Sequence, residues 1–270
     1  MDIKARFFEM KRQGRQIAVL TGYDFPTAKA EAEAGVDLIL VGDSVGTNLL
    51  GYASEQEVQL ADIAHHVRAV RRGAPATPIL ADLPYRTYEM PEMAAASARA
   101  LRDAGADMVK FEGAHPEIAA AIVSAGIPCC GHLGLEPQTH LDKKLRGRSA
   151  AEATQLVRDA IALDKAGIAM LVLELIPEVV AARVTQAINA PTIGIGAGRY
   201  TNGQVLVITD LLGLTGASFR HNRRYAELGP LIATAMTSYV RDVRDHAFPT
   251  EANTFAMPEE ALLAFENGGG

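Results

Sequence analysis

Residues 104–134 read AGADMVKFEGAHPEIAAAIVSAGIPCCGHLG and contain one complete strand–helix–strand unit. The run Met108–Phe111 is short and apolar, as expected for a buried strand, and Pro116–Ala125 has helical spacing with proline in its first turn. Gly126 then predicts a short turn into a second strand, Pro128–Gly131. Two strands joined through a helix pair in parallel, because a parallel pair needs a crossover connection. This stretch therefore predicts one unit of an α/β fold.

Strand-like and helix-like segments alternate in the same way along the rest of the chain. Eight strands are expected, at Ile17–Leu20, Leu38–Val41, Pro78–Ala81, Met108–Phe111, Pro128–Gly131, Met170–Leu173, Thr192–Ile195 and Val205–Ile208. Helices are expected between them at Pro26–Ala34, Glu57–Arg72, Pro91–Ala104, Pro116–Ala125, Ala150–Ala166 and Glu178–Ile188. Eight such units in 270 residues favour a closed (β/α)8 TIM barrel, with an open doubly wound sheet as the alternative.

Two further helices are expected outside these units. Ile3–Gln13 has amphipathic spacing and is predicted to cap the bottom of the barrel, and Tyr225–Ala247 predicts one long helix after the last strand. No linker or change of composition divides the chain, so residues 1–270 are predicted to form a single (β/α)8-barrel domain. Residues from about 250 to 270 are predicted to form a partly ordered tail that frays at Glu266–Gly270.

The composition is typical of a globular protein of the reducing cytoplasm. Apolar residues make up 49% of the chain, and the net charge of −6 disfavours binding to nucleic acid. The N-terminal segment carries scattered charges instead of an apolar signal core, and no run of about 18 apolar residues predicts a membrane span. Cys129 and Cys130 are adjacent in one strand and point to opposite faces, so two buried thiols are expected instead of a disulfide.

Ionisable residues follow seven of the eight expected strands. They are Asp24, Asp43, Asp82, Lys110 with Glu112, His132, Glu174 and Asp210. Any one of them has a structural explanation, such as a turn-capping aspartate, a core histidine or a Lys–Glu ion pair. In a barrel of this kind, however, the C-terminal ends of all strands meet at one face, where active sites lie. The pattern as a whole therefore predicts a catalytic centre.

The seventh strand is followed by glycines instead of an ionisable group. The segment Gly194–Gly198 reads GIGAG but lacks the spacing and first-strand position of a dinucleotide fingerprint. Close approach of the backbone to a ligand and tight chain packing are both compatible with it.

The carboxylates among these residues suit a hard metal ion. Asp43 and Asp82 lie on neighbouring strands with Glu112 nearby, and Mg²⁺ takes one or two protein carboxylates while keeping other positions for water and substrate. A 2-oxo acid would occupy such positions through its carboxylate and keto oxygens, and the metal would stabilise the enolate formed by loss of the adjacent proton.

The remaining groups have natural roles in the same chemistry. Lys110 and His132 can orient the substrate carboxylate and the developing oxyanion. Glu174 is flanked by leucines, and an apolar surround would make it a stronger base near neutrality. The sequence therefore predicts an enzyme that turns a small 2-oxo acid into a carbon nucleophile.

At these residues the sequence resembles the ketopantoate hydroxymethyltransferase family of the phosphoenolpyruvate/pyruvate barrel superfamily. The resemblance runs from about Ile17 to about Gly216 and is carried by Val19–Asp24, Val41–Ser44, Val70–Pro75, Leu80–Pro84, Met108–Gly113, Gly131–Gln138, Leu171–Glu174 and Ile193–Gly198.

The resemblance implies a reaction and a role for each site residue. The reaction is hydroxymethyl transfer from 5,10-methylenetetrahydrofolate to 3-methyl-2-oxobutanoate, which gives 2-dehydropantoate in pantothenate biosynthesis. By resemblance, the metal ligands would be Asp43, Asp82 and Glu112 on Mg²⁺; the substrate-binding residues would be Asp43, Ser44, Asp82, Lys110 and His132; the base would be Glu174. The family also implies a cytoplasmic homo-oligomer, typically a decamer.

Three loops depart from the family pattern, at Gly51–Glu55, Thr139–Arg148 and Arg220–Asn222. All three are expected near the mouth of the site, where the acceptor is chosen and water excluded. The alternative is therefore a superfamily lyase or aldolase that acts on another 2-oxo acid. A barrel that only binds a ligand is the third possibility, and it predicts the loss of some of the site residues, none of which is missing.

Overall fold

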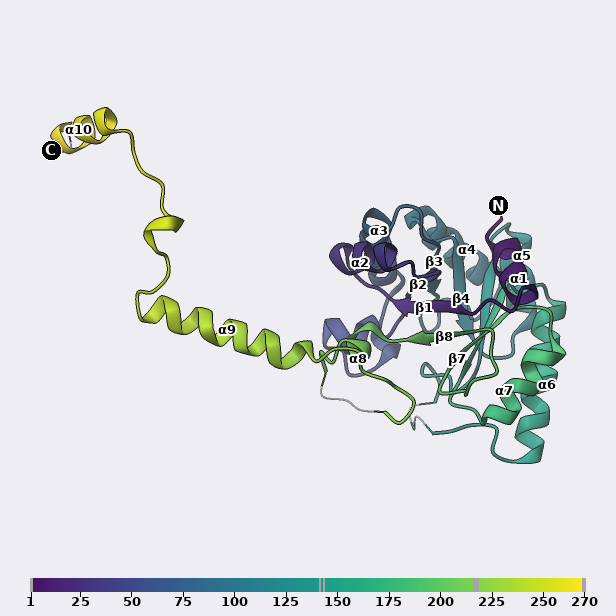
Figure 1. Ribbon diagram of the computed structural model, residues 1–270. Coiled ribbons are helices and arrows are strands. Elements are labelled where there is room, and N and C mark those ends of the chain that lie inside the picture. Colours follow the sequence, from purple (N-terminus) through teal and green to yellow (C-terminus); the bar gives the residue numbers. More distant parts are fainter. Residues whose placement is uncertain (1, 141, 143, 216–218, 269–270) are drawn as a thin grey trace.

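Eight short apolar segments form a closed parallel barrel in which each strand pairs with the next and the last pairs with the first (Figure 1). The computed structural model describes residues 2–140, 142, 144–215 and 219–268. The strands are β1 (Ile17–Thr21), β2 (Leu38–Val41), β3 (Ile79–Asp82), β4 (Met108–Glu112), β5 (Cys129–Gly134), β6 (Met170–Glu174), β7 (Thr192–Ile195) and β8 (Gly203–Leu206). The predicted (β/α)8 fold is confirmed, and the doubly wound sheet is excluded.

Helices cover most of the outside of this barrel. They are α2 (Phe25–Ala34), α3 (Leu60–Gly73), α4 (Pro91–Ala104), α5 (Pro116–Ser124), α6 (Ala150–Lys165), α7 (Glu178–Ala187) and the short α8 (Ile208–Leu211). The long β2–α3 connection contains a π-helical turn at Gly46–Leu50 and a 3₁₀ turn at Glu55–Glu57. Proline in the first turn of α2, α4 and α5 fixes a helical φ where the backbone N–H needs no partner, which explains these helix starts.

The eighth strand begins two residues earlier than the sequence predicts. Instead of Val205–Ile208, the strand is Gly203–Leu206, and α8 begins at Ile208. Gly203 lies against the carbonyl oxygen of Ile17 so closely that a side chain would not fit there. The strand therefore starts at a residue of low strand propensity, which the apolar pattern overlooks.

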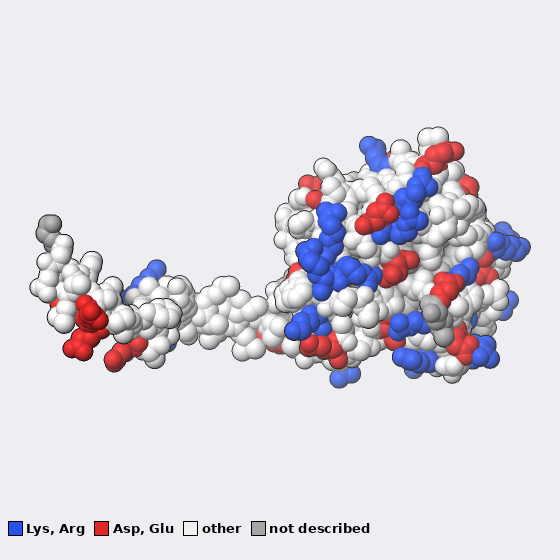
Figure 2. All heavy atoms as spheres, turned by 90° about the horizontal axis from the view of Figure 1, so that it is seen from above, with Lys and Arg blue, Asp and Glu red and all other residues white. Residues whose placement is uncertain are grey.

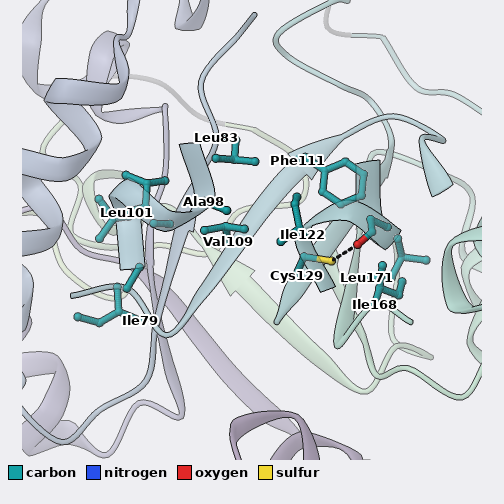
Figure 3. Close-up of a cluster of buried hydrophobic side chains, with 14 of the residues drawn as sticks. Ile79, Leu83, Ala98, Leu101, Val109, Phe111, Ile122, Cys129, Ile168 and Leu171 are labelled. Carbon is teal, nitrogen blue, oxygen red and sulfur yellow. Dashed lines mark hydrogen bonds between the residues drawn. The ribbon is translucent and has the colours of Figure 1, made fainter. Parts of the chain in front are cut away.

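Two apolar layers result from the alternation of side chains along the strands. One fills the barrel, and the other lies between the strands and the surrounding helices, where Figure 3 shows Ala98 and Ile122 next to Val109. Cys129 belongs to the outer layer and Cys130 to the inner layer, and both are free and buried. The expectation of two buried thiols on opposite faces is confirmed.

The N-terminal helix α1 (Ile3–Arg12) closes the bottom of the barrel, as predicted. Its Phe7 and Met10 are buried in the inner apolar layer. Lys11 Nζ donates to the carbonyl oxygens of Thr185 at 3.1 Å, Ile188 at 2.9 Å and Ala190 at 3.0 Å. A cation at the C-terminal end of α7 satisfies carbonyls that the helix leaves unpaired.

The ring of helices is incomplete beside β8 and β1. The outward-facing Ala18 and Gln204 are exposed, and Leu20 and Leu206 are half-buried, whereas every residue of β2, β3, β4 and β5 is buried. In the part of the chain that the structure describes, no long helix packs between α7 and α2. These two strands therefore present an uncovered outer face.

The chain beyond β8 leaves the barrel as a projecting arm (Figure 1). It contains α9 (Leu228–Arg244), which is shorter at both ends than the predicted Tyr225–Ala247, a 3₁₀ turn at Glu251–Asn253, and α10 (Glu259–Gly268). Neither helix has a buried residue. The helix α10 continues to Gly268, through part of the segment that the sequence predicts to fray, while Gly269 and Gly270 lie outside the described residues.

None of the described helices combines the length and the apolar composition needed to cross a bilayer.

One buried carboxyl group makes the stability of the fold depend on pH. Glu31 on α2 packs against Gly22 and is only 3% exposed, and neither carboxyl oxygen has a hydrogen-bond partner among the described residues. Burial, with a smaller effect of Asp24, raises the pKa of Glu31 from 4.5 to about 8. The folded protein therefore keeps a proton that the unfolded chain releases, so this contribution to stability is complete below pH 4.5 and is lost as pH rises to about 8.

The substitution Glu31→Met is expected to flatten this pH dependence. The wild-type melting temperature should fall between pH 5 and pH 9 by on the order of 5 °C more than that of E31M, because E31M has no carboxyl group to ionise at this position. Calorimetric melting curves at a series of pH values test this. The exposed α2 variant Glu33→Met serves as the control, and parallel curves for wild type and E31M would contradict the assignment.

Candidate active site

A cavity of about 420 Å³ opens at the C-terminal ends of the strands, and it contains every residue that the sequence predicts for the site. Those residues are Asp43, Ser44, Asp82, Lys110, Glu112, His132 and Glu174. The barrel brings them together because parallel strands of similar length end at one face. The volume is in the range of small-molecule sites in proteins.

Two buried aspartates form one wall of the cavity. Asp43 follows β2 and Asp82 ends β3, and the backbone N–H of Asp43 donates to Asp82 Oδ2 at 3.0 Å. The side chains are 5% and 2% exposed. Burial and the charge of Asp82 raise the pKa of Asp43 to about 7, although Lys110 and Gln138 oppose this shift. Two carboxylates this close cost free energy unless cations accompany them.

Lys110 supplies one of these cations. It lies beside Asp82 in the pairing of β3 with β4, and its Nζ is 3.2 Å from Asp82 Oδ1. Burial alone would lower the pKa of Lys110, but Asp82, Glu112 and Asp43 outweigh it and raise the pKa. Lys110 therefore stays protonated although it is buried.

His132 connects two glutamates across the cavity. Its Nδ1 is 3.4 Å from Glu112 Oε1, and its Nε2 is 3.2 Å from Glu174 Oε2. Burial and Lys110 lower the pKa of His132, but its contacts with Glu112 and Glu174 prevail and raise the pKa to about 9. The imidazole is therefore cationic at neutral pH, with Nδ1 turned toward Glu112 and Nε2 toward Glu174.

The surroundings of Glu174 differ from the apolar setting that the sequence suggests. Leu173 points outward into the layer under the helices, while Leu175, at φ 45°, lines the cavity. The nearest polar neighbour of Glu174 is the cationic ring of His132, and 19% of the glutamate side chain is exposed. The sequence predicts an apolar surround for Glu174, but Leu173 does not contribute to it, because successive strand residues point to opposite faces.

Ser44 lies at the start of the β2–α3 connection. Its Oγ is 2.8 Å from the hydroxyl of Tyr23, which is almost fully buried after β1. Gly42 leaves room for this arrangement, because a side chain there would come within 3.0 Å of Ser44 Oγ. The hydroxyl of Ser44 is therefore held beside Asp43 at the cavity wall.

Gln138 is a part of the site that the strand pattern does not reveal. It is fully buried, and its Nε2 donates to Asp43 Oδ2 at 2.7 Å and to the carbonyl oxygen of Leu83 at 3.0 Å. Its backbone N–H donates to Glu112 Oε2 at 3.0 Å, and its Oε1 accepts from the hydroxyl of Tyr88 at 2.5 Å. Gln138 thus fixes two of the three carboxylates predicted to bind the metal.

The other residues at strand ends have different positions. Asp24 accepts from the backbone N–H of Thr27 at 2.8 Å and caps α2, so it has a structural role. Asp210 lies in α8 and lines the cavity opposite Asp82 and Lys110, next to the β7 and β8 residues Ile195 and Val205.

Two of the three loops that depart from the family pattern contribute residues to the cavity lining. The loop at Gly51–Glu55 contributes Glu55 to the cavity lining, and the segment at 220–222 contributes His221. The third, Thr139–Arg148, includes residues 141 and 143, which lie outside the described residues.

The carboxylates of Asp43, Asp82 and Glu112 meet some of the requirements of a binding site for a divalent cation. Asp82 Oδ1 is buried and accepts no well-aligned hydrogen bond from the described residues, so its lone pairs are available. Among those same residues, no three His, Cys, Asp or Glu side chains are arranged to enclose a metal by themselves. The site therefore suits an ion that takes one or two protein carboxylates and completes its shell with water and substrate, as Mg²⁺ does.

Several known sequences that are similar to this chain belong to one enzyme family. A family described as ketopantoate hydroxymethyltransferase matches residues 3–251 of this chain. A 3-methyl-2-oxobutanoate hydroxymethyltransferase of Roseiflexus sp. (strain RS-1) is 47% identical over 261 residues, 94% of each chain. One from Thermus thermophilus is 45% identical over 90% of this chain and 96% of its own, and one from Geobacillus sp. (strain WCH70) is 41% identical over 99% of both.

Solved structures with a similar fold are much more distant in sequence. A 2,3-dimethylmalate lyase of the PEP mutase/isocitrate lyase superfamily has a TM-score of 0.62 at 16% identity and covers 100% of both chains. A phosphonopyruvate hydrolase in complex with oxalate and Mg²⁺ has a TM-score of 0.62 at 12% identity, over 99% of this chain and 96% of its own. At these identities the likeness concerns the barrel alone.

Proposed function

Because this chain belongs to the ketopantoate hydroxymethyltransferase family and is a hydroxymethyltransferase of pantothenate biosynthesis, we propose that the cavity performs the family reaction with a divalent metal and a folate donor. The donor is 5,10-methylenetetrahydrofolate, the acceptor is 3-methyl-2-oxobutanoate, and the metal is Mg²⁺. The observation that carries this proposal is the arrangement of Asp43 and Asp82 beside Lys110, with Glu174 reached through His132.

The acidic wall and its cations hold the 2-oxo acid. Asp43 and Asp82 would hold the metal, with Glu112 as a further carboxylate of the metal site, and the metal would supply a Lewis acid for the keto oxygen of the substrate. Lys110 pairs with the substrate carboxylate, and Ser44 donates a hydrogen bond to it. His132, cationic at neutral pH, places a positive charge near the oxygen that becomes negative in the enolate, at a site that is largely shielded from water.

Glu174 then acts as the base. Its carboxylate removes the proton from C3 of 3-methyl-2-oxobutanoate, and the electron pair of the broken C–H bond forms the enolate. Water adds to the one-carbon unit of the donor, and both C–N bonds break, so that the two protons of water go to the nitrogens of tetrahydrofolate and its oxygen stays on the released formaldehyde carbon. C3 then bonds to this carbon, and the resulting alkoxide takes the proton held by Glu174. His132 Nε2, 3.2 Å from Glu174 Oε2, directs the carboxylate into the cavity.

The experiment that tests the proposal separates the two half-reactions. The protein is incubated in D₂O with Mg²⁺ and 3-methyl-2-oxobutanoate, with and without 5,10-methylenetetrahydrofolate, and the C3 proton is followed by NMR. We expect metal-dependent exchange without folate and 2-dehydropantoate only with it. Exchange with a different 2-oxo acid alone would support the lyase or aldolase alternative, which sequence identities of 12–16% to such barrels do not favour.

We also propose that the protein acts in the cytoplasm as a homo-oligomer, with a decamer expected from the family. The arm beyond the barrel supports self-association, because α9 carries an unburied apolar stripe at helical spacing: Leu231, Ile232, Met236, Tyr239, Val240 and Val243. Figure 2 shows charged side chains scattered over the barrel but few along the first part of the arm. On a second copy of the chain, the uncovered outer face of β8 and β1, which includes Ala18, Leu20 and Leu206, would receive this stripe.

A charge placed within this stripe is therefore expected to dissociate the oligomer. Met236 is 64% exposed in the single chain, and Met236→Glu would put a carboxylate into the subunit contact, weakening association by at least about tenfold. Sedimentation velocity measures the change in mass. Thr237→Glu, a neighbour that lies off the stripe, is the control, and an unchanged mass for M236E would show that α9 does not join subunits.

A further inference from the structure

The cavity extends well beyond the acidic wall that would hold the 2-oxo acid. Its opposite side is formed by residues after β6 and β8, including Leu175, Asp210, Phe219 and His221. None of these residues takes part in the deprotonation described above. The inference that follows rests on the proposed function, because it assigns this second half of the cavity to the second substrate.

A pair of stacked rings forms a flat surface in this half. The rings of Phe219 and His221 have centroids 5.7 Å apart and an interplanar angle of 21°, and Phe219 is 50% exposed. Gly196 holds the pair against the barrel, because a side chain there would come within 2.7 Å of Leu175 Cδ2 and 3.2 Å of His221 Cγ. The glycines after β7 thus serve chain packing, and the packing positions an aromatic surface over the cavity.

A carboxylate stands beside these rings. Asp210 is 9% exposed, and Asn222 Nδ2 donates to its Oδ2 at 2.6 Å, while Thr215 Oγ1 lies 3.5 Å from its Oδ1. Each carboxylate oxygen can accept about two hydrogen bonds, so Asp210 keeps the capacity to accept two more. Asn222 Oδ1 is a further buried acceptor with no partner in the described part of the chain. Acceptors therefore outnumber donors at this point.

We propose that Asp210 and the Phe219–His221 pair bind the 2-amino-4-oxopteridine ring of the folate donor. That ring is flat, so it stacks on aromatic side chains, and one edge carries an N–H and an amino group that match the two oxygens of a carboxylate. Discrimination by such a buried acceptor is strong, because an analogue without these donors leaves it unpaired.

The position of the pair relative to the base agrees with this assignment. Glu174 and His221 line the same cavity, and burial lowers the pKa of His221 although Glu174 and Asp210 oppose this shift. A pterin stacked there would present its one-carbon unit toward Glu174 and hence toward C3 of the acceptor. The two substrates would then occupy opposite halves of one cavity.

The test uses pterin itself as the probe, because its fluorescence can be followed in a chain that has no tryptophan. Pterin titrations are compared for wild type, Asp210→Asn, Phe219→Leu and the control Glu227→Gln, an exposed carboxylate nearby that does not line the cavity. We expect wild type and E227Q to bind equally, and D210N and F219L to bind about 10- to 100-fold more weakly. The KM for 5,10-methylenetetrahydrofolate should rise in parallel.

Exchange of the C3 proton in D₂O without folate distinguishes this inference from the proposed function. If D210N and F219L retain metal-dependent exchange within about twofold while losing pterin affinity, the donor site is supported. Unchanged pterin affinity in both variants would overturn the donor site and leave the proposed function intact. Absence of exchange in the wild type would overturn the proposed function whatever the pterin result.

Discussion

Replacing Glu174 by glutamine is expected to slow metal-dependent exchange of the C3 proton of 3-methyl-2-oxobutanoate by about 10²- to 10⁴-fold, the usual contribution of a positioned base. The amide has the shape of the carboxylate but cannot accept the proton at C3. Because it still fits beside His132 Nε2, the cavity should keep its form and E174Q should bind the 2-oxo acid. Exchange is followed by NMR in D₂O, and ligand binding by calorimetry.

Glu178→Gln provides the matched control. Glu178 lies four residues further along the chain, pairs with Arg199 and does not line the cavity, so E178Q should exchange the C3 proton at the wild-type rate. Full exchange in E174Q would assign the base to another group.

The second large effect is expected from Asp82→Asn. The change removes one of two adjacent buried carboxylates and leaves Lys110 with less opposing charge, so affinity for Mg²⁺ should fall by at least about 100-fold. Binding of Mn²⁺, followed by electron paramagnetic resonance, measures this directly without reference to catalysis. C3 exchange should be lost at ordinary metal concentrations and partly restored at high ones.

Two further variants show whether the effect belongs to the metal site. Gln138→Leu removes a donor to Asp43 but no carboxylate, so a smaller loss of about 10- to 100-fold is expected. Asp103→Asn, at an exposed position of α4, should bind Mn²⁺ like the wild type. Wild-type Mn²⁺ affinity in D82N would show that Asp82 serves the protein only as the partner of Lys110.

The barrel could be predicted from sequence because its strands are short, buried on both faces and separated by helices with clear ends. The apolar runs at β2 and β7 were located to the residue, as was α4. The position predicted for β8 is two residues too late. Gly203 and Gln204 belong to this strand because their backbone pairs with β1, and a hydrophobicity pattern does not reveal such pairing.

The site was predictable for a related reason. Strand ends of a parallel barrel converge, so Asp82, Lys110 and His132 could be placed together before any distance was known. Gln138 could not, because it lies in a loop behind the cavity wall, and only the folded backbone places its amide between Asp43 and Tyr88. The contact between Glu174 and His132 could not be predicted either, because it depends on the direction of the Glu174 side chain, and the neighbouring leucines in the sequence suggest an apolar environment instead.

The attachment of α1 has a consequence for biosynthesis on the ribosome. The helix α1 precedes the barrel, and its Lys4 and Lys11 bond to the carbonyl oxygens of Gly167, Thr185, Ile188 and Ala190, more than 160 positions later. The pairing of β1 with β8 likewise forms only after β8 has been synthesised. Contacts between residues so far apart in sequence form slowly. The bottom of the barrel therefore stays open until most of the polypeptide has been translated. Nascent chains of this protein should therefore depend on protection from aggregation until the eighth strand has left the exit tunnel.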